Sequence, residues 1–184
     1  MAERNLTKRW EIAPKIDGMA DEALADYPPF FRQLLYNRGI RTAQGAQQYL
    51  SNDGELADPF LLLGMESAVD RLVAAIDNGE KIVVYGDYDV DGVTATVMMV
   101  EVLQRLGGNV EPYIPNRFEE GYGLNDEAIQ TLASEHSAKV ILTVDCGIRS
   151  PREAITASNL GIDLIISDHH FPNGDLPAGY AVLC

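Results

Sequence analysis

With 184 residues, the chain is long enough for one globular domain and a small accompanying segment. Its 28 acidic and 14 basic residues give a formal net charge of −14, which argues against a generic basic surface for nucleic acids or acidic membranes. Hydrophobic residues make up 46% of the sequence, no apolar run approaches a membrane span, and two cysteines are too few for a disulfide framework, so we expect a cytoplasmic protein with reduced thiols.

Residues 1–65 carry nine acidic and seven basic residues, whereas residues 66–184 carry nineteen acidic and seven basic residues. In the first part we expect an irregular arm over 1–27, a helix over 30–37 that ends near Gly39, and a second helix from an N-cap at Thr42 to about residue 50. This part shows no recognisable chemistry. We therefore interpret residues 1–65 as a small N-terminal helical appendage with a packing role.

From residue 66 onwards, helical and strand patterns alternate. Val69, Leu72, Val73 and Ile76 have the spacing of an amphipathic helix. Ser150 opens a capping-box pattern at the start of a later helix. We expect helices over 66–77, 94–106 and 151–160, and a further helix that Asn125 caps, with Asp126 and Glu127 in its first turn. We expect strands over 81–85, 110–114, 140–144, 164–166 and from 180 onwards. The alternation predicts an α/β domain over 66–184 with a parallel sheet flanked by helices.

Acidic clusters follow three of the expected strands. Asp87, Asp89 and Asp91 come after the first strand, Asp145 after the third, and Asp168 after the fourth, where His169 and His170 follow it. Right-handed crossovers bring the carboxyl ends of parallel strands to one edge of the sheet, where ligand sites form. Each cluster alone is more often a turn, a helix cap or a surface loop, but three at one edge favour a functional site.

Carboxylates crowded together repel one another, and a divalent cation relieves that repulsion. Oxygen ligands with an imidazole suit Mn²⁺, Mg²⁺ or Fe²⁺ rather than structural zinc. Asp89 and Asp91, read as a turn, can reach one metal or bridge two, Asp145 can bridge, and His169 adds a nitrogen ligand. Such a two-metal site is typical of phosphoryl transfer, with His170 placed to meet a phosphate oxygen.

Other functions remain open at this point. The segment from Asp89 to Val93 also fits the start of haloacid-dehalogenase-type phosphatases, with Asp89 as nucleophile, although Lys139 lies at the wrong end of its strand. A non-catalytic scaffold is a further alternative. No phosphate-binding loop of the G-x-x-x-x-G-K-[S/T] type is present, and Cys146 has no evident dyad partner for nucleophilic catalysis.

The motifs at 86–92, 143–148 and 167–170 resemble those of the DHH phosphoesterases, a family named for the triplet that stands here at Asp168–His170. Segments 115–124 and 35–40 are similar to the N-terminal part of the family's single-strand-specific DNA exonucleases. They are less like its pyrophosphatases and its hydrolases of short oligonucleotides or cyclic dinucleotides, which remain the alternative within the family.

The resemblance implies a metal-dependent 5′-to-3′ exonuclease acting on single-stranded DNA in DNA repair and recombination. It also implies Mn²⁺ or Mg²⁺ in a two-metal site, with a repair helicase and a single-strand-binding protein as further partners and no membrane. Such exonucleases are much longer, so we expect this chain to be an N-terminal fragment, weak or inactive alone. The implied residues are metal ligands Asp89, Asp91, Asp145 and His169, catalytic or orienting Asp87, Asp168 and His170, and substrate-contacting Arg117 and Tyr122.

Overall fold

The computed structural model describes residues 11–51, 56–116, 121 and 123–184. The chain divides into two compact units, Met1–Leu56 and Ala57–Cys184, so the observed division precedes the boundary expected at residue 65. Each unit is described by itself. Among the described residues, no helix is both long and apolar enough to cross a membrane.

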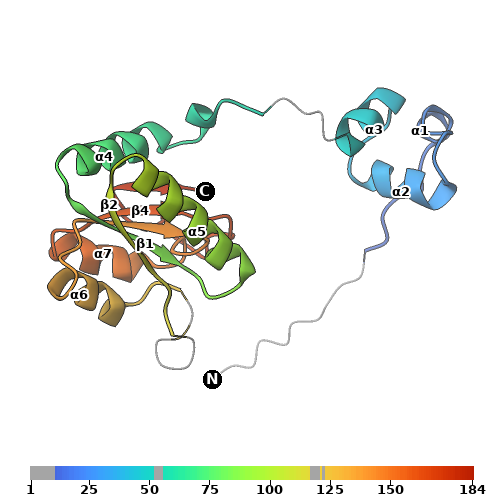
Figure 1. Ribbon diagram of the computed structural model, residues 1–184. Coiled ribbons are helices and arrows are strands. Elements are labelled where there is room, and N and C mark those ends of the chain that lie inside the picture. The colour runs from blue at the N-terminus through green and yellow to red at the C-terminus, as the bar shows by residue number, and fades with distance from the viewer. Residues whose placement is uncertain (1–10, 52–55, 117–120, 122) are drawn as a thin grey trace, which may run out of the picture. The chain divides into compact units, whose positions relative to one another are not determined.

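The first unit contains three short helices, α1 (Gly18–Ala23), α2 (Pro29–Asn37) and α3 (Ala43–Leu50) (Figure 1). The helices expected over 30–37 and 42–50 are confirmed, including the cap, where the Gly45 N–H donates to Thr42 Oγ1 over 3.1 Å. The expectation of an irregular arm was wrong over α1, because six residues are too few to show a helical period. Leu24, Leu35 and Ala46 form the buried centre of this unit.

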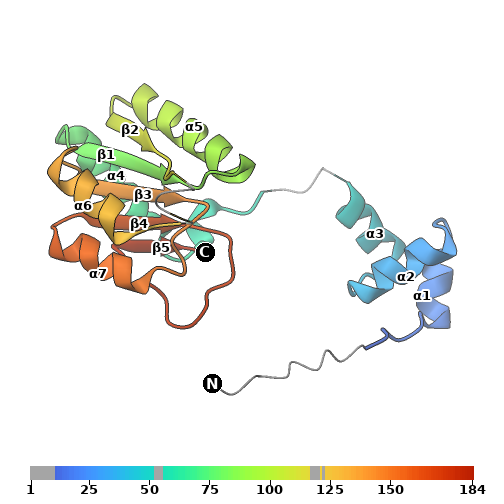
Figure 2. The same ribbon diagram turned by 90° about the horizontal axis from the view of Figure 1, so that it is seen from below.

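The second unit is a five-stranded parallel sheet in the order β2-β1-β3-β4-β5, covered by helices. The strand order can be followed from top to bottom in Figure 2. This architecture confirms the predicted fold class. Its elements are η1 (Pro59–Leu61), α4 (Met65–Asp77), β1 (Lys81–Gly86), α5 (Val90–Arg105), β2 (Asn109–Tyr113), α6 (Asp126–Ser134), β3 (Val140–Val144), α7 (Pro151–Asn159), β4 (Asp163–Ser167) and β5 (Ala181–Leu183).

Helices α4 and α5 pack on one face of the sheet, and α6 and α7 contribute to the core on the other face. On α4 the helix prediction holds but its buried face was only partly right. Leu72 and Ile76 pack against the core, whereas Val69 and Val73 are 36% and 49% exposed. The buried line of α4 runs instead through small alanines, which let the helix approach the sheet closely.

Two further expectations near helix starts were wrong. Helix α5 begins at Val90 rather than at Thr94. The capping box at the start of α7 does not form, since Ser150 makes no side-chain cap hydrogen bond, although Pro151 does occupy the first helical position. Asn125, by contrast, caps α6 as predicted, because its Oδ1 accepts a hydrogen bond from the Ala128 N–H over 2.8 Å.

At the amino edge of the sheet, charged side chains are paired with opposite charges. Arg71 donates to Asp163 over 2.5 Å and to Glu80 over 2.6 Å. Glu111 lies 3.2 Å from Lys81 Nζ and 2.5 Å from His136 Nδ1. Burial alone would raise the pKa of Glu111, but these two partners outweigh burial and lower it. Acidic residues at this edge are therefore neutralised by the chain's own cations.

Candidate metal centre

The acidic residues of the opposite, carboxyl edge are aligned by strand register. The last paired residues Gly86, Val144 and Ser167 stand side by side on β1, β3 and β4. The residues that follow them are Asp87, Asp145 and Asp168. The chain crosses from β2 to β3 over β1, so the carboxyl ends of β1 and β3 form the switch point at which parallel sheets bind ligands.

The loop between β1 and α5 is held tightly against the strand end. Asp89 is the N-cap of α5, and its Oδ1 accepts a hydrogen bond from the Gly92 N–H over 3.1 Å. A Cβ at Gly92 would collide with the backbone of Asp87, and one at Gly86 would collide with Thr96 Oγ1. These two positions need glycine because the helix start and the strand end are in contact. Asp91 is in the first turn of α5, not in the turn expected from sequence.

Asp87 is a completely buried carboxylate at the end of β1. Its Oδ1 accepts a hydrogen bond from the Tyr88 N–H over 2.8 Å. Its Oδ2 is the one buried side-chain oxygen or nitrogen in the described part of the chain without a hydrogen-bond partner. A buried oxygen without a partner carries a desolvation cost, which a bound cation would remove.

Asp145 lies at the centre of the acidic edge, with 7% of its side chain exposed. Its backbone has φ = 62°, in the left-handed region that aspartate tolerates better than most residues. Burial raises the pKa of Asp145, and repulsion from Asp89 and Asp91 raises it further, against partial compensation from the two histidines. A non-glycine residue in this conformation is typical of functional sites, where the fold holds a side chain in one direction.

Asp168 is held by four hydrogen bonds. The His169 and His170 N–H groups donate to Oδ1 over 2.7 and 3.0 Å, and the Ile148 N–H donates to Oδ2 over 2.9 Å. His170 Nδ1 lies 2.7 Å from Oδ1. Burial would raise the pKa of Asp168, but these hydrogen bonds outweigh it and lower the pKa. Its oxygens are thus occupied in fixing the loop and the His170 ring.

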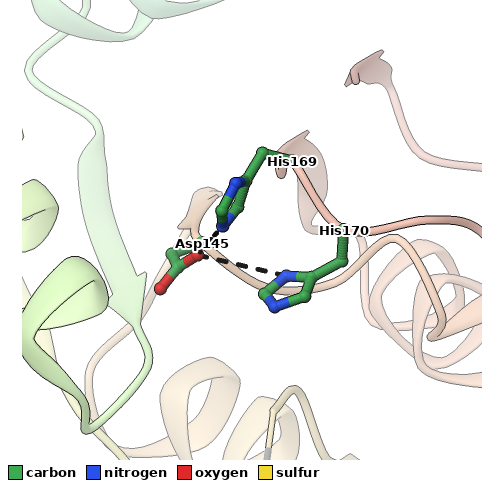
Figure 3. Close-up of side chains that lie close together, drawn as sticks. All are labelled: Asp145, His169 and His170. Carbon is green, nitrogen blue, oxygen red and sulfur yellow. Dashed lines mark ion pairs between the residues drawn. The ribbon is translucent and has the colours of Figure 1, made fainter. Parts of the chain in front are cut away.

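The two histidines converge on Asp145 from the loop after β4 (Figure 3). His169 Nε2 lies 2.9 Å from Asp145 Oδ1, and His170 Nδ1 lies 4.0 Å from the same oxygen. His169 is 70% exposed in its side chain and can therefore turn toward a ligand, whereas His170 is 34% exposed and held by Asp168.

Two groups of ligand atoms form at this edge, each with its atoms within 4.8 Å of one another, and Asp145 belongs to both. The first contains Asp87, Asp89 and Asp145, and the second contains Asp145, His169 and His170. They border a cavity of about 400 Å³ whose lining includes Asp91, Asp145 and His169. Carboxylate oxygens with imidazole nitrogen fit Mn²⁺ or Mg²⁺, and the partnerless oxygen of Asp87 supports a cation at this place.

The sequence-predicted residues separate into three sets. The structure brings together Asp87, Asp89, Asp145, His169 and His170. Asp91 and Asp168 line the same cavity but belong to neither group, and Asp168 holds the His170 ring through Nδ1. Arg117 and Tyr122 lie outside the described residues. Sequence reasoning missed the left-handed backbone of Asp145, and glycine two residues later was the only nearby signal of an unusual turn.

Comparisons with known proteins agree with this geometry. The family model described as "DHH family, N-terminal domain" matches residues 81–184. The chain is 42% identical over 180 residues to the single-stranded-DNA-specific exonuclease RecJ of Bacillus subtilis, covering 95% of this chain and 22% of that protein. It is 41% identical over 171 residues to RecJ of Escherichia coli, covering 92% and 29%. The chain thus spans less than a third of the length of these relatives.

Solved structures give the same result. A crystal structure of exonuclease RecJ bound to manganese matches with a TM-score of 0.64 and 39% identity, covering 70% of this chain and 32% of that one. RecJ of Thermus thermophilus in complex with Mn²⁺ matches with a TM-score of 0.65 and 29% identity, covering 90% and 23%.

Proposed function

Because this chain belongs to the DHH family through residues 81–184, we propose that it provides the metal-binding part of a 5′-to-3′ exonuclease that hydrolyses single-stranded DNA in repair and recombination. The observation that carries this proposal is the convergence of Asp87, Asp89, Asp145, His169 and His170 at one sheet edge. Its relatives are named for that substrate, and they are three to five times longer than the matching part. The match to this family and its motifs leaves no support for a haloacid-dehalogenase-type phosphatase.

We propose a ligand set that the described geometry supports. Asp89, Asp145 and His169 hold the metal, and Asp91, which lines the same cavity from the first turn of α5, joins them. Asp87 supplies a buried oxygen to the same group. Two divalent ions, Mn²⁺ or Mg²⁺, would supply an activated water and charge stabilisation at the phosphate when bound. Asp145, common to both groups, is the residue best placed to bridge them.

The remaining residues position the substrate. Asp168 favours the proton on Nδ1 of His170, because its carboxylate lies 2.7 Å from that atom. Nε2 of His170 is then the nitrogen that faces the substrate, and it donates to a phosphate oxygen in the imidazolium form, in which both ring nitrogens carry a proton. We retain Arg117 and Tyr122 as substrate contacts from the sequence resemblance alone. A repair helicase and a single-strand-binding protein as partners, and action in the cytoplasm, belong to the same proposal.

The test measures metal binding and cleavage separately. Manganese binding to the 184-residue chain is followed by calorimetry, and cleavage of end-labelled single strands of increasing length is followed in Mn²⁺ with a chain extended to the length of the RecJ relatives. Asp89→Asn and His169→Ala should each weaken metal binding and reduce cleavage about a hundredfold or more. Asp175→Asn, an exposed carboxylate outside both groups, is the matched control. Undiminished Mn²⁺ binding and cleavage in Asp89→Asn would refute the site, and cleavage confined to the shortest strands would favour an oligonucleotide hydrolase.

A further inference from the structure

The longest acid-free stretch of the sequence lies in the N-terminal unit. Residues 27–52 contain three arginines and no acidic residue, so this 26-residue segment carries +3 while the other 158 residues carry −17. No other acid-free run in the chain exceeds nine residues. The segment includes both α2 and α3, which follow each other along the chain (Figure 1), and is called here the α2–α3 segment. Positive charge is therefore concentrated on one small element of a strongly acidic protein.

Two of the three arginines are free to meet an external anion. Arg32 is used internally, since its Nε donates to the Tyr27 carbonyl over 2.6 Å and its Nη1 lies 3.2 Å from Asp21. Arg38 and Arg41 are exposed and form no ion pair within the described residues. The Arg38 guanidinium donates to the Leu34 carbonyl over 3.3 Å. That hydrogen bond holds the group at the end of α2 without neutralising it.

Arg41 is placed in a similar way by an aromatic ring. Its guanidinium carbon lies 5.1 Å from the centroid of the Tyr36 ring. Tyr36 in turn donates to Asp17 over 3.2 Å, and the charge of Asp17 offsets part of that of Arg41. The charge of Arg38 is thus less offset by neighbouring acids than that of Arg41, and Arg41 extends the positive surface across the turn between the helices.

A hollow of about 200 Å³ lies between α2 and α3, beside Arg38. It is lined by Phe31, Leu34, Leu35, Arg38, Tyr49 and Leu50. Tyr49 is 57% exposed, although an aromatic side chain loses free energy by facing water. An exposed aromatic ring next to an unpaired cation matches a nucleotide, because the base stacks on the ring while the phosphate meets the cation.

We propose that the surface of the α2–α3 segment, made of Arg38, Arg41 and Tyr49, binds single-stranded nucleic acid. The two arginines contact backbone phosphates, and Tyr49 stacks on a base. Arginine and tyrosine are also common in protein interfaces. The absence of any carboxylate along 26 residues of an acidic chain favours a polyanion. The inference takes its substrate class from the proposed function but needs neither the metal nor the sheet edge.

The experiment measures binding of a fluorescein-labelled oligothymidine to the whole 184-residue chain by anisotropy, in EDTA and over a range of salt concentrations. Each phosphate contact to a single strand adds about 0.7 to the slope of log K against log salt. Arg38→Ala combined with Arg41→Ala should therefore lower the slope by about 1.4. Tyr49→Ala should weaken binding roughly tenfold, whereas Tyr49→Phe, which keeps the ring, should bind as the unsubstituted chain does.

The matched control combines Arg105→Ala with Arg152→Ala. These arginines are 77% and 82% exposed and paired with Glu101 and Asp126, so the control changes net charge equally on the other unit. It should leave the slope unchanged. Equal slopes for the two double variants, or no measurable binding by the unsubstituted chain at about 50 mM salt, would overturn the proposal. If Arg38→Ala with Arg41→Ala changed the sedimentation coefficient but left DNA binding unchanged, the surface would be a protein interface instead. The EDTA keeps this outcome separate from any failure of the metal site.

Discussion

Replacing Asp145 by asparagine should affect stability in opposite directions with and without metal. Asparagine tolerates the left-handed backbone at φ = 62° and keeps an oxygen near His169, so the change removes mainly a charge. Ligand atoms of Asp145 and Asp89 lie within 4.8 Å. At that separation two carboxylates repel by roughly 1 kcal/mol in water and 3.5 kcal/mol at an effective dielectric constant of about 20. Because Asp89 is exposed, we expect a relief of about 1–2 kcal/mol.

In EDTA, the Asp145→Asn variant should therefore melt about 3–6 °C above the unsubstituted chain. In Mn²⁺ at a hundred times its dissociation constant, the unsubstituted chain should gain about 2.7 kcal/mol, and the variant should gain little because the shared ligand has lost its charge. The order of the two melting temperatures should then reverse. Calorimetric melts under both conditions test this directly.

Asp126→Asn is the control for this reversal. It also removes a carboxylate, but one that pairs with Arg152 and accepts a hydrogen bond from Thr156. It should lower stability slightly and by the same amount with and without metal. If Asp145→Asn lowers the melting temperature in EDTA, the carboxylates do not repel one another. If Mn²⁺ raises both melting temperatures equally, Asp145 is not a metal ligand.

Three other substitutions or treatments test separate parts of the structure. Gly92→Ala normally would stabilise a helix by about 1 kcal/mol, but here the added Cβ meets the backbone of Asp87, so denaturant melts should show a loss of about 1–3 kcal/mol instead. Burial raises the pKa of the Cys146 thiol, so a maleimide should label Cys184 in the folded chain and Cys146 only after unfolding, as mass spectrometry can show. Because the pKa of Glu111 is lowered, this carboxylate stabilises the fold above its unfolded-state pKa, and that stabilisation is lost as pH falls through the folded-state pKa. Glu111→Gln should therefore lose less stability on acidification than the unsubstituted chain, in denaturant melts at several pH values.

Much of the sheet unit was predictable because its strands and helices have characteristic patterns of apolar residues. The strands are continuous apolar runs, as required when both sheet faces are covered. Once the sheet is parallel, strand ends share an edge, and Asp87, Asp145 and Asp168 must lie near one another. The exact register that aligns them depends on backbone pairing between distant segments, which no local pattern specifies.

The details that sequence reasoning missed all involve contacts between elements. The sequence pattern predicts a turn at Asp89 and Asp91, with a helix only from residue 94, so Gly92 falls outside the expected helix. In the fold it lies inside α5, since only glycine fits against the backbone of Asp87. This shifts Asp91 onto the helix. It also leaves Asp87, for which the resemblance implies a catalytic or orienting role, with a buried partnerless oxygen beside the other carboxylates. The spacing of the acidic residues could not tell whether Asp91 lies in a turn or in the first turn of a helix.

Net charge was the least informative property of the sequence, because a sum over a long region conceals short segments of opposite charge. Residues 1–65 total −2 and show no recognisable chemistry, and the sequence therefore predicts a packing role for them. The same residues contain the α2–α3 segment at +3, flanked by acidic segments, and only the structure shows which of its arginines are used internally. Electrostatic attraction to a polyanion depends on charges within about 10 Å, the screening length at moderate salt. For this reason an overall −14 does not by itself argue against a nucleic-acid surface on α2 and α3.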